Sequence, residues 1–157
     1  MIKLIFLCAT IAFPNKDTLP TQLPLLHPIR KADFKYISSE YGWRIDPITQ
    51  DSTFHEGIDI ATISTTAAVY ATADGIIETL DYDKKRGLFI IINHALGFQT
   101  QYFHLGNFFI RERQRVKAGE KIGLVGNTGK STASHLHYEV HFEGVAIDPL
   151  DMQTKQK

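Results

Sequence analysis

The sequence contains a single cysteine, Cys8, among 157 residues. One cysteine cannot form a disulfide within the chain, so a scaffold that depends on disulfides is excluded. A chain of this length can bury a hydrophobic core without such cross-links. Seven histidines stand against the one cysteine, so a bound metal ion would have to take imidazole and carboxylate ligands.

An excess of charge of either sign is also lacking. Seventeen lysines and arginines balance 17 aspartates and glutamates, which gives a formal net charge of zero. Proteins whose main task is to grip nucleic acid or an anionic membrane surface need a basic excess. We therefore expect no nucleic-acid partner.

The N-terminal hydrophobic run is short. It occupies residues 4–13 and follows Lys3, whereas a transmembrane helix needs ~20 apolar residues. Its length is typical of the apolar part of a secretory signal, so residues 1–13 are predicted to be a signal or another hydrophobic segment. A buried strand, or a fragment of a longer chain, would explain the same run.

Proline gathers in the segment that follows. Four of the six prolines lie within residues 14–31, where the sequence has little periodicity. This composition predicts an extended linker. The folded domain is predicted to span residues 32–150, with a flexible tail at residues 151–157.

No segment keeps an apolar period of 3.6 residues for three helical turns. Instead, short apolar runs alternate with Gly, Asn and Asp turns, which predicts strands. The predicted strands are residues 69–73, 75–80, 88–93, 98–103, 121–125 and 135–142. The expected fold is therefore mainly β, a single domain built on antiparallel sheets.

The last predicted strand carries polar side chains at every second position. Strand geometry places these side chains on one face and the apolar side chains on the other, against a core. The polar face consists of His135, His137, Glu139 and His141. A solvated edge strand would show the same alternation, so this pattern alone does not establish a site.

A second histidine segment reads His55-Glu-Gly57-Ile-Asp59. A straight strand would hold His55 and Asp59 ~13 Å apart, too far to share an ion bound at ~2 Å. Gly57 permits a bend or a positive φ that would bring the two together. A surface histidine and a helix-capping aspartate would explain the pair equally well.

His104 follows an apolar strand, and His94 ends another. Each histidine, taken alone, is more often a hydrogen-bonded structural residue than a functional one. Tyr102 lies two residues before His104, so alternation predicts that it shares the strand face of His104.

Taken together, these segments resemble the lysostaphin-type (LytM-domain) zinc metallopeptidases, which cut peptide bonds in bacterial peptidoglycan. The resemblance keeps its order and spacing over residues 38–149. The matching motifs are residues 38–47, 55–59, 70–75, 93–94, 102–105, 116–123, 126–132 and 135–140. One departure is Ala133, where the family usually has glycine.

The resemblance implies which residues do the chemistry. It assigns His55, Asp59 and His137 as ligands of one zinc ion, which leaves a fourth position for water. It assigns His104 and His135 as catalytic histidines that do not bind the metal. It also implies a LytM-type (duplicated hybrid motif) fold with long loops around a groove.

The implied function is zinc-dependent endopeptidase activity on the peptide cross-links of peptidoglycan. The expected partners are peptidoglycan peptide stems, and the expected location is the bacterial cell envelope, periplasmic or secreted. Two alternatives are a noncatalytic LytM domain that activates a cell-wall amidase and a zinc D,D-carboxypeptidase. The sequence leaves open whether the cleaved bond is D-Ala–diaminopimelate or Gly–Gly.

Other motif residues have supporting roles. A histidine ligand usually donates its second ring nitrogen to an acceptor, for which Glu139 and Asn93 are candidates. Arg44 and Asp46 are expected to order the loop that leads to the first metal ligand, and Trp43 is expected in the core.

Overall fold

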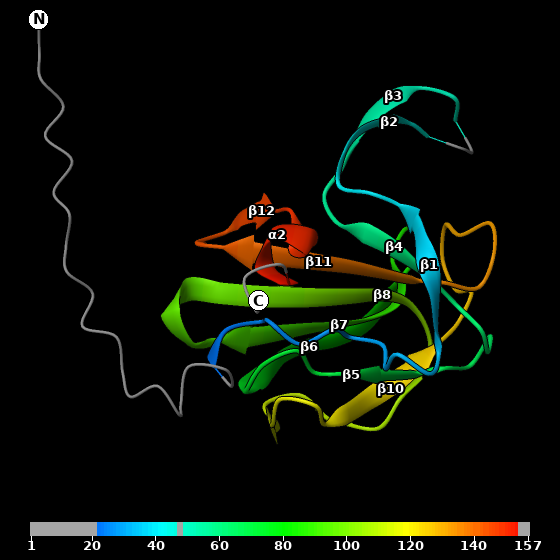
Figure 1. The fold of residues 1–157 in the computed structure, drawn as a ribbon. Helices are drawn as coiled ribbons and strands as arrows, with labels where there is room; N and C mark the ends of the chain where they lie inside the picture. The colour runs from blue at the N-terminus through cyan, green and yellow to red at the C-terminus, as the bar shows by residue number, and fades with distance from the viewer. Residues whose placement is uncertain (1–21, 47–48, 154–157) are drawn as a thin grey trace, which may run out of the picture.

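The computed structural model describes residues 22–46 and 49–153 (Figure 1). The predicted segment 1–13 lies outside these residues, as do the start of the predicted linker and the end of the predicted tail. Within the described part of the chain, every helix is too short or too polar to cross a membrane.

The described residues form twelve strands, joined by short turns and two brief helices. The strands are β1 (Phe34–Ser39), β2 (Gly42–Ile45), β3 (Ser52–His55), β4 (Ile58–Thr62), β5 (Ala68–Tyr70), β6 (Gly75–Asp83), β7 (Gly87–His94), β8 (Phe98–Phe108), β9 (Arg115–Val116), β10 (Lys121–Val125), β11 (Leu136–Phe142) and β12 (Val145–Ile147). The 3-10 turn η1 covers Ala95–Gly97, and helix α2 covers Pro149–Gln153.

Ten strands belong to one antiparallel sheet. Its main path runs β1-β4-β11-β8-β7-β6-β9, with β12 beside β11, and β10 between β8 and β5. The remaining two strands, β2 and β3, form a hairpin that projects beyond the sheet (Figure 1). This arrangement confirms the prediction of a mainly β, antiparallel, single-domain fold.

All six strands predicted from apolar runs are present; residues 121–125 have the predicted ends, and the other five strands have shifted ends. The strand predicted at residues 98–103 continues to Phe108, and the one predicted at residues 75–80 continues to Asp83. In both extensions polar residues interrupt the apolar run, which hides the strand's end from a hydrophobicity pattern. The other strands are mostly short or half-exposed, and so they give little periodicity.

The core consists mainly of aliphatic side chains from the central strands, together with two buried tyrosines. Tyr102 and Tyr138 lie side by side, with ring centroids 5.3 Å apart. Their hydroxyls meet at Thr72: Tyr138 donates to its Oγ1, and Tyr102 accepts its backbone N–H. Because both phenols have polar partners, their burial carries no uncompensated desolvation cost.

The described end of the predicted linker, residues 22–31, packs on this core. Ile29 is 1% exposed and belongs to the hydrophobic cluster. The carbonyl of Pro28 accepts the N–H of Tyr70, and Leu26 donates to the carbonyl of Thr72. These residues are therefore part of the folded unit, because the apolar residues between the prolines cover the edge near β5.

Gly57 marks the sharp connection between β3 and β4. Its φ lies outside the left-handed region, so a positive φ is not what this position requires. A Cβ atom here would overlap the carbonyl of Tyr138 and approach the side chain of Glu139. Gly57 is needed because β11 passes too close for any side chain.

Replacing Gly57 by alanine is expected to lower the free energy of unfolding by about 3 kcal/mol, because the added methyl group must displace backbone of β11. Gly144→Ala is the control: its φ of 82° strains alanine, but the surrounding space is open, so it should cost only about 1 kcal/mol. Urea denaturation of both variants measures the difference. Equal losses would contradict the close approach at Gly57.

Candidate metal centre

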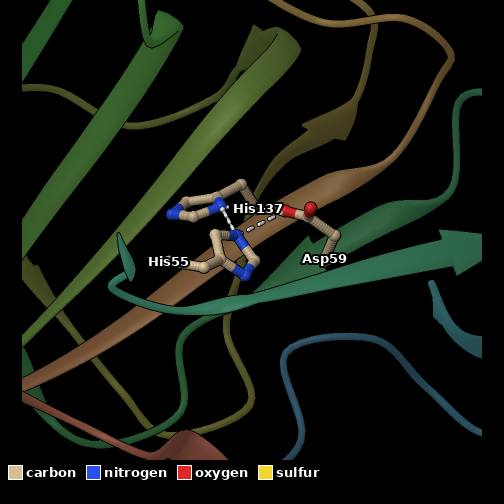
Figure 2. Close-up of side chains that lie close together, drawn as sticks. All are labelled: His55, Asp59 and His137. Carbon is tan, nitrogen blue, oxygen red and sulfur yellow. Dashed lines mark hydrogen bonds and ion pairs between the residues drawn. The ribbon is translucent and has the colours of Figure 1, made fainter. Parts of the chain in front are cut away.

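Three strands bring His55, Asp59 and His137 to one point (Figure 2). His55 ends β3, and Asp59 follows four residues later on β4, beyond the turn at Gly57. His137 lies on β11, directly opposite Asp59 in the antiparallel register. All three side chains are buried.

Three atoms of these side chains face one another. Nε2 of His55 lies 3.2 Å from Oδ1 of Asp59 and 3.0 Å from Nδ1 of His137, and the latter two atoms are 2.8 Å apart. Ligands bound tetrahedrally at about 2.0–2.2 Å lie roughly 3.3 Å from one another. The cluster therefore fits a metal ion with only a slight expansion.

Hydrogen bonds on the outer sides of the two imidazoles set which nitrogens face inward. His55 donates from Nδ1 to the carbonyl of Glu40 at 2.7 Å, and His137 donates from Nε2 to Oε1 of Glu139 at 2.8 Å. With those nitrogens protonated, the lone pairs of the other two point into the cluster. Of the two sequence candidates for this supporting role, the structure brings Glu139 to the centre, whereas Asn93 accepts a hydrogen bond from Gln99.

Glu139 is itself held in place by a second histidine, His141. Its Oε2 lies 2.7 Å from Nε2 of His141, so one carboxylate bridges two histidines on the same strand face. Burial raises the pKa of Glu139, but hydrogen bonds from His137 and His141 outweigh burial and lower the pKa to about 2. The carboxylate thus stays charged and keeps accepting both hydrogen bonds.

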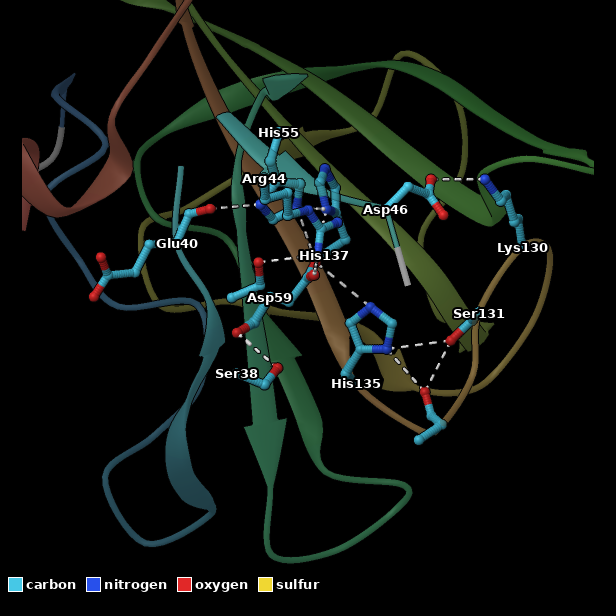
Figure 3. Close-up of polar contacts among 12 residues, drawn as sticks. Ser38, Glu40, Arg44, Asp46, His55, Asp59, Lys130, Ser131, His135 and His137 are labelled. Carbon is cyan, nitrogen blue, oxygen red and sulfur yellow. Dashed lines mark hydrogen bonds and ion pairs between the residues drawn. The ribbon is translucent and has the colours of Figure 1, made fainter. Parts of the chain in front are cut away.

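Asp59 is anchored by Arg44 of the β2–β3 hairpin (Figure 3). Nη1 of Arg44 lies 3.3 Å from Oδ2 of Asp59 and donates to Oγ of Ser39 at 2.9 Å. Burial raises the pKa of Asp59, but hydrogen bonds from three histidines outweigh it and hold that pKa below its usual range. Arg44 leaves Oδ1, the other oxygen, to face the two imidazoles.

The position between Asp59 and His137 attracts positive charge. Burial lowers the pKa of His137, but hydrogen bonds to Asp59 and Glu139 outweigh burial and raise the pKa to about 9. A metal ion that binds here must displace the proton these groups favour. Metal binding is therefore expected to strengthen as pH rises toward that value.

The other two predicted histidines lie beside the cluster. The rings of His104 and His135 are 4.8 Å apart, and the ring of His104 is 6.1 Å from that of His137. Nε2 of His135 lies 3.5 Å from Oδ1 of Asp59, while its Nδ1 donates to the carbonyl of Ala133 (Figure 3). All five residues predicted from the sequence thus meet in one place.

His104 has a left-handed backbone, with a φ of 62°. This conformation interrupts the strand alternation. Phe103 therefore stacks on the ring of His137 at 5.1 Å, while Tyr102 faces the core, fully buried. The expectation that Tyr102 shares the site face was wrong, because alternation counts do not hold across a left-handed residue.

Thr128 holds the ring of His104. The carbonyl of Thr128 accepts the Nδ1–H of His104 at 2.8 Å, and its hydroxyl ties β7 to β8 through Leu88 and Leu105. Burial lowers the pKa of His104 to about 4, so the ring is neutral near pH 7, with an unprotonated Nε2. Nothing in the sequence pointed to Thr128 beyond its place in a turn motif.

A groove of about 420 Å³ opens over the cluster. It is lined by Arg44, Asp46, Thr53, Phe54, His55, Glu56, Lys85, Arg86, Gln101, Phe103, His104, Lys130, His137, Glu139 and His141. His94 lies elsewhere, hydrogen-bonded to the carbonyl of Asp74 and to Thr100. The expectation of a core position for Trp43 was wrong: its side chain is 74% exposed, on a hairpin outside the main sheet, where the ring of Phe54 on the opposite strand packs against it.

Comparison with known proteins identifies similar domains. ShyC, a peptidoglycan DD-endopeptidase of Vibrio cholerae, is 33% identical over 126 residues, which cover 79% of this chain and 29% of ShyC. Mpg, a DD-carboxypeptidase/endopeptidase of Neisseria meningitidis, is 41% identical over 116 residues, which cover 74% of this chain and 26% of Mpg. The chain thus spans less than a third of the length of either relative.

A solved structure shares the fold. The crystal structure of a zinc containing peptidase from Vibrio cholerae superimposes with a TM-score of 0.72 and 35% identity, over 78% of this chain and 37% of the other. Peptidase family M23 matches residues 53–149, a range that includes all five predicted site residues and more than half of the chain. With the fold and the three-residue cluster, this match shows that the chain belongs to Peptidase family M23, in agreement with the resemblance found in its sequence.

Proposed function

We propose that this domain is a zinc-dependent endopeptidase that hydrolyses peptide cross-links in bacterial peptidoglycan and acts outside the cytoplasm. The observation that carries the proposal is the convergence of His55, Asp59 and His137, with His104 and His135 beside them. A domain that only docks on another enzyme does not need three potential metal ligands with two histidines beside them. The geometry therefore disfavours a noncatalytic role.

The donor set supports zinc as the metal. Two imidazole nitrogens and one carboxylate oxygen are typical of catalytic zinc sites, in which a fourth position takes water or substrate. The similar structure from Vibrio cholerae is named a zinc containing peptidase. When bound, zinc would supply Lewis acidity to the attacking water and to the scissile carbonyl.

His104 has the properties of a hydrogen-bond acceptor. Its Nδ1–H is bound to the carbonyl of Thr128, so Nε2 carries the lone pair, and the residue lines the groove. A pKa near 4 keeps the ring neutral at pH 7. We assign to His104 the acceptance of a hydrogen bond from the attacking water, which orients that water toward the carbonyl carbon.

His135 completes the proton path. Its ring is within 4.8 Å of His104 and is fixed by the carbonyl of Ala133 and the hydroxyl of Ser131. From this position it can stabilise the oxyanion and pass the proton that the attacking water releases on to the leaving amine, as departure of an amine requires. The family of HExxH peptidases uses a glutamate for proton transfer, whereas here two histidines share it.

The assignment of peptidoglycan as the substrate is based on the names of the similar proteins. ShyC is named a peptidoglycan DD-endopeptidase, and Mpg carries both carboxypeptidase and endopeptidase in its name. The double name of Mpg also supports D,D-carboxypeptidase activity as the second candidate for this domain. The two activities differ in whether the groove accepts a stem on both sides of the cleaved bond.

The proposal predicts metal-dependent digestion of cross-linked muropeptides. The zinc-loaded protein should split cross-linked dimers, whereas protein treated with a chelator should lose this activity and regain it with added zinc. His137→Ala should lower kcat/KM by at least 10³-fold, because it removes a ligand. Metal content and product analysis by mass spectrometry measure both effects.

Two outcomes decide between the candidates. Release of D-alanine from uncross-linked pentapeptide stems, without splitting of dimers, would favour the carboxypeptidase. If the native protein digests muropeptides no better than His137→Ala, the hydrolase proposal fails.

A second prediction concerns Glu139, which holds Nε2 of His137. Glu139→Gln should weaken zinc binding by about 10–100-fold, because the amide is a poorer acceptor and no longer fixes the ring. Competition with a chromophoric chelator measures the affinity. The matched control is Gln101→Ala, on the facing strand opposite Glu139, which should leave zinc affinity unchanged; equal losses in the two variants would contradict the supporting role.

A further inference from the structure

The turn between β6 and β7, residues 84–86, lies against the catalytic histidines. The carbonyl of Arg86 accepts the backbone N–H of His104 at 2.8 Å, and the carbonyl of Lys85 accepts the N–H of Lys130 at 3.0 Å. Two backbone hydrogen bonds thus fix the turn beside the loop that carries Thr128. Ser131, which follows Lys130, contacts the ring of His135 through its hydroxyl, so the turn is tied to the side of the site where the leaving amine would receive its proton.

Two of the cations at this end are already neutralised. Nε of Arg86 lies 2.6 Å from Oδ2 of Asp83, and Nζ of Lys130 lies 2.8 Å from Oδ2 of Asp46. Oδ1 of Asp83 also accepts the N–H groups of both Lys85 and Arg86. The carboxylates near the turn are therefore occupied by Arg86, Lys130 and the turn's own backbone.

Lys85 is different. Its side chain is exposed and lines the groove, yet its ammonium has no ion pair or side-chain hydrogen bond within residues 22–46 and 49–153. The backbone of Lys85 is fixed on both sides, so only the side chain must be ordered when a ligand binds. Among the described residues, the groove thus offers one uncompensated positive charge on the turn that is hydrogen-bonded to the backbone of His104.

The opposite end of the groove carries the opposite charge. Glu56 is exposed and lines the groove, and its charge acts on His141. His141 lies four residues beyond His137 on β11, which is ~13 Å along a strand. A peptide with a carboxylate at one end would be attracted to the Lys85 end and repelled from the Glu56 end.

We propose that Lys85 binds a carboxylate on the residue that follows the scissile bond, and so selects cross-links that carry one there. This inference rests on the proposed function. In a D-Ala–diaminopimelate cross-link, the carbon that bears the leaving amine also bears a free carboxylate, whereas the interior of an oligoglycine bridge has none. His135 serves that amine, and the backbone of Lys85 is hydrogen-bonded to Lys130, whose neighbour Ser131 contacts the ring of His135.

The test compares two substrates that differ in one charge. One is a cross-linked muropeptide dimer with the diaminopimelate carboxylate free, and the other is the same dimer with that carboxylate amidated. Native protein should cleave the free form about five-fold faster in kcat/KM, with the preference falling as salt rises. Lys85→Gln should bring the ratio of the two rates close to one.

Lys84→Gln is the matched control. Lys84 sits on the same turn and is exposed, but it does not line the groove, so this variant should keep the five-fold ratio. Melting temperatures of both variants should equal that of native protein, which separates selection of substrate from loss of structure.

Three results overturn the inference. They are an equal native rate on the two dimers, an unchanged ratio in Lys85→Gln, and a native preference for a neutral oligoglycine peptide. Each of these leaves the proposed function standing, provided that some cross-linked peptide is cleaved with zinc. Failure of the native protein to cleave any of the three substrates would instead reject the proposed function.

Discussion

The structure depends on holding three electron-rich atoms within 3.2 Å of one another. Once His137 gives up its proton, as metal binding requires, the lone pairs on His55, Asp59 and His137 repel one another unless a cation lies between them. The protein opposes that repulsion from outside the cluster. Each of the three groups is held by a partner on its outer side. His55 bonds to the backbone carbonyl of Glu40, Asp59 pairs with the guanidinium of Arg44, and His137 bonds to the carboxylate of Glu139. The site is therefore preorganised before any ion arrives.

The sheet supplies the precision that this arrangement needs. Asp59 and His137 are register partners on adjacent strands, so the ladder of backbone hydrogen bonds sets their separation. His55 comes from outside the sheet, on the projecting hairpin, and returns to the site because the turn at Gly57 is tight against β11. Two of the proposed ligands are thus fixed by strand pairing and the third by close packing of one turn.

Much of the fold and of the site could be predicted from the sequence, because it follows from the two-residue alternation of strands and from the spacing of the histidines and aspartate. The alternation in residues 135–142 identified the strand face that carries His137, and the glycine between His55 and Asp59 indicated the bend. The errors arose where local geometry departs from the regular pattern. Left-handed backbone at His104 turned Tyr102 into the core, and Trp43 is exposed because its hairpin leaves the sheet. The packing of residues 22–31 depends on tertiary contacts to β5, which no local pattern records.

The backbone at His104 limits which residues this position can accept through evolution. The φ of 62° at this position is costly for most side chains, and asparagine, aspartate and glycine tolerate it best. Loss of hydrolysis removes the chemical demand for an imidazole but leaves this steric demand in place. Pseudoenzymes descended from such a domain are therefore expected to carry asparagine, aspartate or glycine at this site, a signature that would record an ancestral histidine.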